Sequence, residues 1–271
     1  MRLLKPTSQA ASPVGAVLRE WRAARRMSQL DLALEAGVST RHLSCVETGK
    51  SQPSREMIER FAGALAMPLR ELNALLTAAG FAAAYPETAL RKPALAPVQA
   101  AIDLILKHQE PYPAFVMDRH WNIVETNRAA VAMGDFLIGG SAHSNMVLQF
   151  FDPNDMRSVV ANWEEVAGDL IRHLHDAIAM SPTDQRARDL LERVLRYPGV
   201  PSRWRLREVS ANSAPLLTVE FRKGDHHLRF FSTISTFGTA MDVTVDELMI
   251  ESTFPGDEAT AKICRMLSER H

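Results

Sequence analysis

The 271-residue sequence contains only two cysteines, few aromatic residues and almost no net charge. The cysteines, Cys45 and Cys264, lie in unrelated contexts without CxxC spacing, which argues against a disulfide framework or a zinc cluster. No apolar run approaches the roughly twenty residues needed to span a bilayer, and the N-terminus lacks a signal-peptide core. These absences predict a cytoplasmic protein with no membrane partner, no metal and no cofactor.

The chain has enough apolar residues for two packed cores, at 46% of the sequence, and its length favours two domains. Its charge is unevenly distributed. Residues 1–80 hold 11 Lys and Arg against 7 Asp and Glu, a net charge of +4. Residues 81–271 hold 20 against 25, a net charge of −5. The basic share of the N-terminal part is typical of a module that approaches an anionic partner such as nucleic acid.

Residues 28–49 have the spacing of two short helices joined by a turn at Gly37, which is the pattern of a helix-turn-helix. Ser28 can cap the first helix, with the carboxylate of Asp31 in its first turn. This helix is expected to bury one apolar face, made of Leu30, Ala33 and Leu34. Ser39 can cap the second helix, which buries Leu43 and Val46 and stops at Gly49.

The second helix is expected to present polar side chains outward, because residues four apart share a helix face. These are Thr40, Arg41, Ser44, Glu47 and Thr48. Any pair of amphipathic helices shows caps and a glycine, so this pattern alone leaves simple helix packing as an alternative to DNA binding. Three flanking helices, starting near Pro13, Pro53 and Pro68, complete a predicted five-helix unit with one shared apolar core.

Residues 13–80 resemble the lambda-repressor-like, or XRE, family. The resemblance is carried by Ser28-Gln29, by Ala33 and Gly37-Val38-Ser39, and by Glu47-Thr48-Gly49-Lys50 with Pro53. It implies a DNA-binding set of Gln29, Ser39, Thr40, Arg41, Ser44, Thr48 and Lys50. In that set Gln29, Thr48 and Lys50 would hold phosphates, and Thr40, Arg41 and Ser44 would read bases. Within this set Arg41 is best suited to recognise guanine, because its planar guanidinium can donate two hydrogen bonds, one to O6 and one to N7 of the base.

Residues 81–97, with three prolines, are predicted to be a linker. Beyond it, the periodicity predicts an α+β domain over residues 98–271, with helices packed on one antiparallel sheet. Short strands are expected at 114–118 and 122–126, a hairpin at 216–237 and a further strand at 248–254. The longest predicted helix covers residues 156–180.

Two stretches of this second part, EPYPAFVMDRHWNIVETNRAA and FFSTISTFGTAMDVTVDELMIESTFP, resemble the PAS-like ligand-binding domain of MmyB-like regulators. That family joins the domain to an N-terminal XRE module, in the order expected here. The resemblance implies a homodimer and an apolar small-molecule ligand, with a fatty acid as the best candidate.

A ligand pocket in such a domain is expected between the sheet and its crossing helices. The candidate lining residues are aromatic: Trp121, Phe136, Trp163, Phe230 and Phe237. Simple core packing is the alternative for each of them. Arg205, Arg207 and Arg229 could pair with an acidic ligand head, with surface solvation as their alternative role.

Together the two resemblances predict a dimeric, ligand-responsive transcription regulator that binds double-stranded DNA at a two-fold symmetric operator. One alternative is a regulator whose C-terminal domain only mediates dimerisation or protein contact. Another is an enzyme tethered by the helix-turn-helix, but the sequence offers no nucleophile elbow or phosphate loop. His173 and His175 are two apart on a helix, so their side chains diverge too far to share a metal.

Overall fold

The computed structural model describes residues 13–206 and 216–269, and the chain divides into two compact units. The first unit holds the chain up to Pro86 together with Ile178–Asp184. The second holds Glu87–Ala177 and the chain from Gln185 onwards. Among the described helices, none combines the length and the apolar character that a bilayer span requires.

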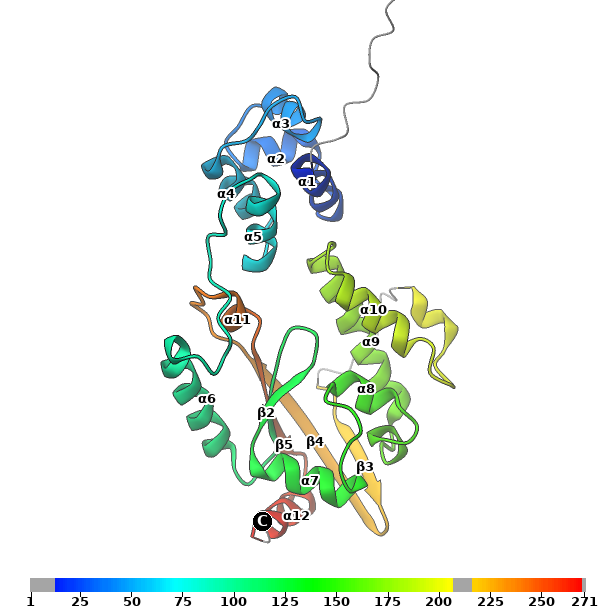
Figure 1. Cartoon of the computed structure of the whole chain (residues 1–271). Helices are drawn as coiled ribbons and strands as arrows, with labels where there is room; N and C mark the ends of the chain where they lie inside the picture. Colours follow the sequence, from blue (N-terminus) through cyan, green and yellow to red (C-terminus); the bar gives the residue numbers. More distant parts are fainter. Residues whose placement is uncertain (1–12, 207–215, 270–271) are drawn as a thin grey trace, which may run out of the picture. The chain divides into compact units, whose positions relative to one another are not determined.

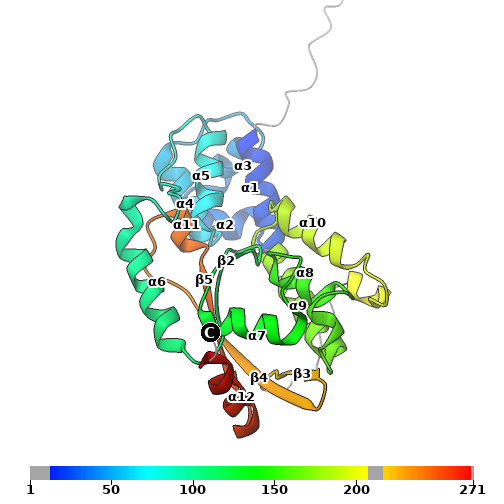
Figure 2. The same cartoon turned by 60° about the horizontal axis from the view of Figure 1, so that its bottom comes forward.

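The first unit contains the five predicted helices (Figures 1 and 2). Their bounds are α1 Pro13–Ala24, α2 Gln29–Glu35, α3 Thr40–Glu47, α4 Arg55–Ala64 and α5 Leu69–Ala78. Ser28 caps α2 through a reciprocal pair of hydrogen bonds: the backbone N–H of Asp31 donates to Ser28 Oγ at 3.1 Å, and the N–H of Ser28 donates to Asp31 Oδ2 at 2.8 Å. Gly37, with φ +66°, makes the turn between α2 and α3.

The apolar core of this unit collects side chains from all five helices. Its largest members are Trp21, Phe61, Leu18, Leu32, Leu43, Ile58, Leu65, Leu75 and Leu76. The predicted apolar face of α2 is wrong at two of its three positions, because Leu30 and Leu34 are 64% and 79% exposed. Ala33 is buried as predicted, and Leu32 is buried in place of the two exposed leucines. Relative to the prediction, helix α2 is rotated about its axis so that Leu32 and Ala33 face α3 and α4. This rotation depends on packing against those helices, which the local sequence of α2 does not specify.

A segment from far along the chain, Ile178–Asp184, completes the first unit. It contains the last residues of helix α9 (Trp163–Met180). The guanidinium of Arg25 donates to the carbonyls of Ala179 and Met180, at 3.0 and 2.9 Å. The carboxylate of Glu71 accepts hydrogen bonds from the hydroxyls of Ser181 and Thr183, at 2.6 and 2.8 Å. Two carbonyls at the end of α9 that lack helical partners are therefore satisfied by Arg25, the residue that follows α1.

The second unit is built on a five-stranded antiparallel sheet with strand order β2-β1-β5-β4-β3 (Figure 1). The strands are β1 Ala114–Met117, β2 Ile123–Thr126, β3 Val219–Lys223, β4 His226–Ser235 and β5 Met249–Pro255. This is the expected α+β architecture. Helix α6 (Ala96–Gln109) covers one face of the sheet, packing Ile102 and Leu106 with Val116 and Ile250.

The opposite face of the sheet lies under α7 (Arg128–Ile138), α8 (Met146–Phe151) and α9. The remaining helices are α10 Gln185–Val194, α11 Val243–Asp246 and α12 Glu258–Ser268, with short 3₁₀ turns at Pro93–Leu95, Met156–Ser158 and Ser202–Arg205. The continuous helix predicted over residues 156–180 is split, because Val160 pairs with Phe221 beside β3. The N–H of Ala161 donates to Glu220 O at 2.7 Å, so this stretch is bonded to β3 instead of continuing a helix, and α9 begins only at Trp163.

Candidate nucleic-acid interface and ligand cavity

Helix α3 carries the predicted base-reading side chains on its outer face. Arg41, Thr48 and Lys50 are exposed, and Thr40 and Ser44 are partly exposed. Ser39 caps the helix by accepting from the N–H of His42 at 3.2 Å. These residues are thus gathered around one short helix, the arrangement that a major-groove reader needs.

Glu47 does not lie on the outer face of α3, where the helical spacing predicted it, but is a buried structural residue of this unit. It is only 1% exposed and accepts hydrogen bonds from Arg22 Nε at 2.8 Å and from Gln29 Nε2 at 2.7 Å. The hydrogen bond to Glu47 raises the pKa of the Arg22 guanidinium, against the opposing effect of burial. The network ties α1, the start of α2 and the end of α3 together. It also commits the amide nitrogen of Gln29, one of the predicted phosphate contacts, to Glu47.

Gly15 allows α1 to pack directly against the backbone carbonyls at the end of α3. A Cβ at this position would lie 2.4 Å from the carbonyl oxygen of Glu47 and 2.7 Å from that of Val46. Only glycine fits this contact, because backbone carbonyls cannot rotate away as a side chain can. The angle at which α3 is presented therefore depends on a residue outside the helix-turn-helix.

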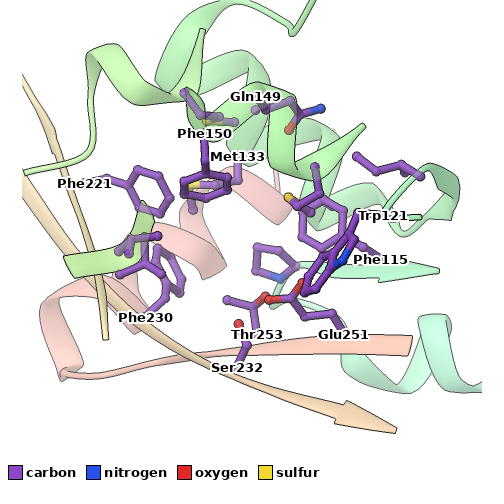
Figure 3. Close-up of a pocket in the computed structure, with 18 of the residues that line it drawn as sticks. Phe115, Trp121, Met133, Gln149, Phe150, Phe221, Phe230, Ser232, Glu251 and Thr253 are labelled. Atoms are coloured by element: carbon purple, nitrogen blue, oxygen red, sulfur yellow. The ribbon is translucent and has the colours of Figure 1, made fainter. Parts of the chain in front are cut away.

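The second unit contains a cavity of about 590 Å³ between the inner face of the sheet and helices α7, α8 and α9 (Figure 3). This volume lies within the range of about 300–1,000 Å³ that is usual for small-molecule sites. Phe150, Phe221 and Phe230 lie toward one end of the cavity, and Phe115 and Trp121 lie toward the other. The walls are mainly apolar, so the cavity suits a ligand with a large apolar portion.

Trp121 is held in the cavity wall by a constrained turn between β1 and β2. Its φ of +66° is uncommon for a residue with a side chain. The turn is closed by the N–H of Trp121, which donates to Asp118 O at 2.9 Å, and by the N–H of Met146, which donates to Trp121 O at 2.9 Å. Such strain persists where surrounding contacts enforce it, and it often marks functional sites.

Charged side chains from α9 also line the cavity: Asp169, Arg172 and His173. Asp169 Oδ2 lies 3.3 Å from His173 Nε2, and Asp169 also pairs with Arg172. The hydrogen bond to Asp169 raises the pKa of His173, although desolvation opposes it. Desolvation pushes the pKa of Asp169 upward, but His173 and Arg172 outweigh it and leave that pKa below its ordinary value. Helix α9 thus brings an internally paired polar cluster to an otherwise apolar space.

Comparison with known families agrees with this two-part architecture. Residues 98–267, well over half of the chain, match the model of the MmyB-like transcription regulator ligand binding domain. The chain belongs to the MmyB-like transcription regulators. Residues 13–75 of this regulator match a helix-turn-helix domain model. The resemblances seen in the sequence are therefore confirmed, and a helix-turn-helix DNA-binding module is joined to a ligand-binding domain.

A curated relative matches a smaller part of this MmyB-like regulator. It is the uncharacterised HTH-type transcriptional regulator RghRB of Bacillus subtilis (strain 168), 39% identical over 77 residues. The match covers 28% of the present chain and 53% of the relative, so the chain spans about half the length of the relative that it matches.

The structure places two of the five aromatic residues predicted for the pocket, Trp121 and Phe230, in the cavity wall. The other three belong to the packed cores and lie outside this wall as the described residues define it. Trp163 donates its indole N–H to Phe150 O at 2.6 Å, and Phe136 makes an edge contact with His226. Phe237 packs with the α6 cluster on the other face of the sheet. Their prediction is corrected because aromatic type alone does not specify which neighbours a side chain packs against or, for Phe237, which face of the sheet it joins.

Two of the three arginines suggested for an acidic ligand head, Arg205 and Arg229, are not part of the cavity wall. Arg205 is exposed at the end of a 3₁₀ turn, Arg229 pairs with Glu220 at 3.3 Å, and Arg207 lies outside the described residues. Within the described ranges, no group of three or more His, Cys, Asp and Glu side chains is arranged to hold a metal.

Sequence reasoning missed several cavity residues, among them Phe115, Phe150, Phe221, His173 and Glu251. Strand alternation could have identified those on the sheet, since Phe115 and Phe221 occupy inward positions of β1 and β3. The residues on α8 and α9 gave no such signal. Their inward direction depends on how the helices cross the sheet.

Proposed function

We propose that this MmyB-like regulator is a homodimer that binds a two-fold symmetric operator through α3 and senses an apolar small molecule, such as a fatty acid, in the cavity of its second unit. The cavity of about 590 Å³ with aromatic walls is the observation that carries the ligand part of the proposal. A domain that only mediated dimerisation or protein contact would have no use for such a space.

Base reading is assigned to Thr40, Arg41 and Ser44, and phosphate binding to Gln29, Thr48 and Lys50, with Ser39 at the start of the helix. A two-fold dimer presents its two recognition helices about 34 Å apart, so half-sites one helical turn apart are expected. The ligand changes operator affinity only through its different affinities for DNA-competent and incompetent dimers, a coupling of about 1–3 kcal/mol in typical cases.

Helix α9 supplies a route for this coupling. Its residues Leu170 and His173 line the cavity, and its last turn belongs to the first unit, where Arg25 binds the carbonyls of Ala179 and Met180. A shift of α9 on ligand binding would therefore act on Arg25, the residue that follows α1. In an Arg25→Ala variant we expect DNA binding to persist and the ligand response to weaken.

The first test is selection of binding sites from a random-sequence DNA pool, followed by affinity measurements on the selected site. Arg41→Ala should relax base preference at one position of each half-site, by about 1–3 kcal/mol of discrimination. Lys50→Ala should weaken binding to all sequences alike and reduce the salt slope by about one unit. Equal behaviour of the two variants would overturn this sorting of roles, and a selected site without two-fold symmetry would overturn the dimeric arrangement.

The second test asks whether a ligand exists. The purified protein is denatured, extracted and analysed by mass spectrometry, and the stripped protein is titrated with fatty acids while operator binding is monitored. A co-purified apolar molecule that changes operator affinity supports the proposal. Empty protein whose operator affinity no apolar compound alters would favour the alternative, a domain for dimerisation or protein contact alone.

A further inference from the structure

One short stretch of the second unit is rich in arginine. Residues 185–206 hold six Arg and only two acidic residues, Asp189 and Glu192, a net charge of +4. The remainder of residues 81–271 holds 14 Lys and Arg against 23 Asp and Glu, a net charge of −9. The C-terminal part of the chain is therefore acidic except for this stretch, which contains α10 and the 3₁₀ turn Ser202–Arg205. A local charge opposite to that of its surroundings indicates a surface for an anionic partner.

Helix α10 presents part of this charge on a fixed outer face. Arg186 and Arg193 are both exposed, and because they are seven residues apart they lie on the same side of the helix. Seven residues rise by about 10 Å, so the two guanidinium groups can reach different groups of one extended partner. The helix packs against α8 in the second unit. The side of α10 that faces the unit is buried through four apolar residues, Ala187, Leu190, Leu191 and Val194.

The stability of α10 does not account for Arg186. This residue lies in the first turn, which holds no acidic residue and where the positive end of the helix dipole disfavours a cation. The two carboxylates of the helix have other partners. Asp189 Oδ1 accepts from Gln185 Nε2 at 2.8 Å, and Glu192 pairs with Arg196 at 3.2 Å. The positive charge of Arg186 is therefore placed against the preference of its own helix, which favours a role in binding.

The chain connects the start of α10 directly to the DNA-binding unit. The preceding segment, Ile178–Asp184, belongs to the first unit, where Arg25 binds two of its carbonyls. Arg186 is only two residues beyond Asp184, so covalent geometry keeps its Cα within about 7 Å of that residue's Cα. Arg25 in turn is four residues before Gln29, which is assigned to a phosphate at the start of α2. A DNA backbone bound at the start of α2 is therefore expected to pass near the beginning of α10.

We propose that the outer face of α10, with Arg186 and Arg193, is a second DNA surface that binds the phosphate backbone beside the bases read by α3. This inference rests on the proposed operator reading by α3. All six cations of residues 185–206 are arginine, whose planar guanidinium binds phosphate oxygens through paired N–H donors. Phosphate contacts carry no sequence information, so this surface raises affinity for every DNA sequence and leaves base preference unchanged.

The experiment compares the full-length parent protein with an Arg186→Gln/Arg193→Gln double variant. Fluorescence anisotropy measures affinity for the selected operator and for a random-sequence duplex over a series of salt concentrations. Each lost phosphate contact should reduce the slope of log affinity against log salt concentration by about 0.9. The same loss corresponds to about eightfold weaker binding per contact at about 0.1 M salt, because affinity scales with salt concentration to that power. Both duplexes should be affected by the same factor.

An Arg222→Gln/Lys223→Gln double variant is the matched control. These two residues are exposed neighbours on β3, so the control removes the same two charges from the same unit and leaves α10 intact. We expect its salt slope to equal that of the parent. Hydroxyl-radical footprinting at saturating protein then locates the contact. The parent should protect a stretch of backbone that the α10 variant leaves open, while the protection caused by α3 is retained.

The outcomes separate this inference from the function on which it rests. If the parent binds its operator and the α10 variant keeps the parental slope and footprint, the second DNA surface is wrong while reading by α3 stands. An equal loss in both double variants would also overturn it, because net charge would then be the cause. Weaker binding together with dissociation of a dimer, seen by analytical ultracentrifugation, would assign the arginines to an acidic surface of a second copy instead. A parent protein that binds no duplex at all would overturn both the second surface and the operator function.

Discussion

Replacing Gly15 by alanine should loosen the recognition helix, although Gly15 is not part of the helix-turn-helix. The added Cβ would lie 2.4 Å from the backbone oxygen of Glu47, at the end of α3. Gly63, in α4, is the matched control, since a Cβ there would meet nothing within 4 Å. Both substitutions replace a helical glycine by the best helix former, so they differ mainly in the contact with α3.

The magnitudes follow from two opposing effects. Alanine is favoured over glycine within a helix by about 0.5–1 kcal/mol, and this gain applies at both positions. Overpacking costs about 1–3 kcal/mol, and a clash with an immobile carbonyl belongs at the upper end. We therefore expect Gly15→Ala to destabilise the first unit by about 2 kcal/mol and Gly63→Ala to stabilise it by about 0.5–1 kcal/mol.

Hydrogen–deuterium exchange of the full-length protein measures this difference locally. Peptides that cover α3 should exchange roughly thirty-fold faster in Gly15→Ala, the factor that corresponds to about 2 kcal/mol. Affinity for the selected operator should fall in the same variant. Exchange as slow as in the parent protein, or shifts of both variants in the same direction, would refute the argument that α1 and α3 are in backbone contact.

Three further predictions concern single side chains. Arg22→Ala should lower the free energy of unfolding, measured in urea, by about 3 kcal/mol, because the buried carboxylate of Glu47 would lose its positive partner and keep only the hydrogen bond from the Gln29 amide. A loss below about 1 kcal/mol would show that solvent screens the ion pair between Arg22 and Glu47. Asp169→Asn should lower the pKa of His173, which NMR titration of the ring measures directly, since the hydrogen bond to Asp169 raises it. Because the folded pKa of His173 is raised, its contribution to stability is complete below the unfolded value and is lost as pH rises through the folded value; an unchanged NMR titration would contradict the pairing. Burial raises the pKa of Cys264 to about 11, so iodoacetamide at neutral pH should label it only after unfolding; rapid labelling of the native protein would disprove its burial.

Local signals in the sequence were sufficient for the first unit. Capping serines, a turn glycine and helical periodicity act over a few residues, and all five predicted helices form. They failed only where a distant partner decides, as in the rotation of α2 that buries Leu32 and exposes Leu34. Four of the five outward positions predicted for α3, Thr40, Arg41, Ser44 and Thr48, are at least partly exposed, because helical geometry sets which residues share a face. The fifth, Glu47, is buried because it pairs with Arg22 of α1.

In the second unit, too, the sequence predicted some features of the fold and of the cavity but not others. Strand alternation predicted the hairpin of β3 and β4, and the same alternation places Ser232 and Glu251 on the inner face. The late start of α9, at residue 163 and not 156, could not be predicted from the local sequence. Val160 fits the helical spacing but pairs with Phe221 of β3. A strand partner about sixty positions away in sequence leaves no trace in a local pattern.

The sequence by itself determined the five helices of the first unit, the exposure of Arg41 and Lys50, and that a regulator of this family has a DNA-binding module and a ligand-binding domain. These properties follow from short-range backbone geometry and from matched sequence patterns. Only the tertiary structure decided that Glu47 is buried beside Arg22, that the end of α9 joins the first unit, and that Ser232, Glu251 and Thr253 line a cavity with aromatic walls. Such features depend on contacts between residues far apart in the chain, which periodicity and capping do not encode.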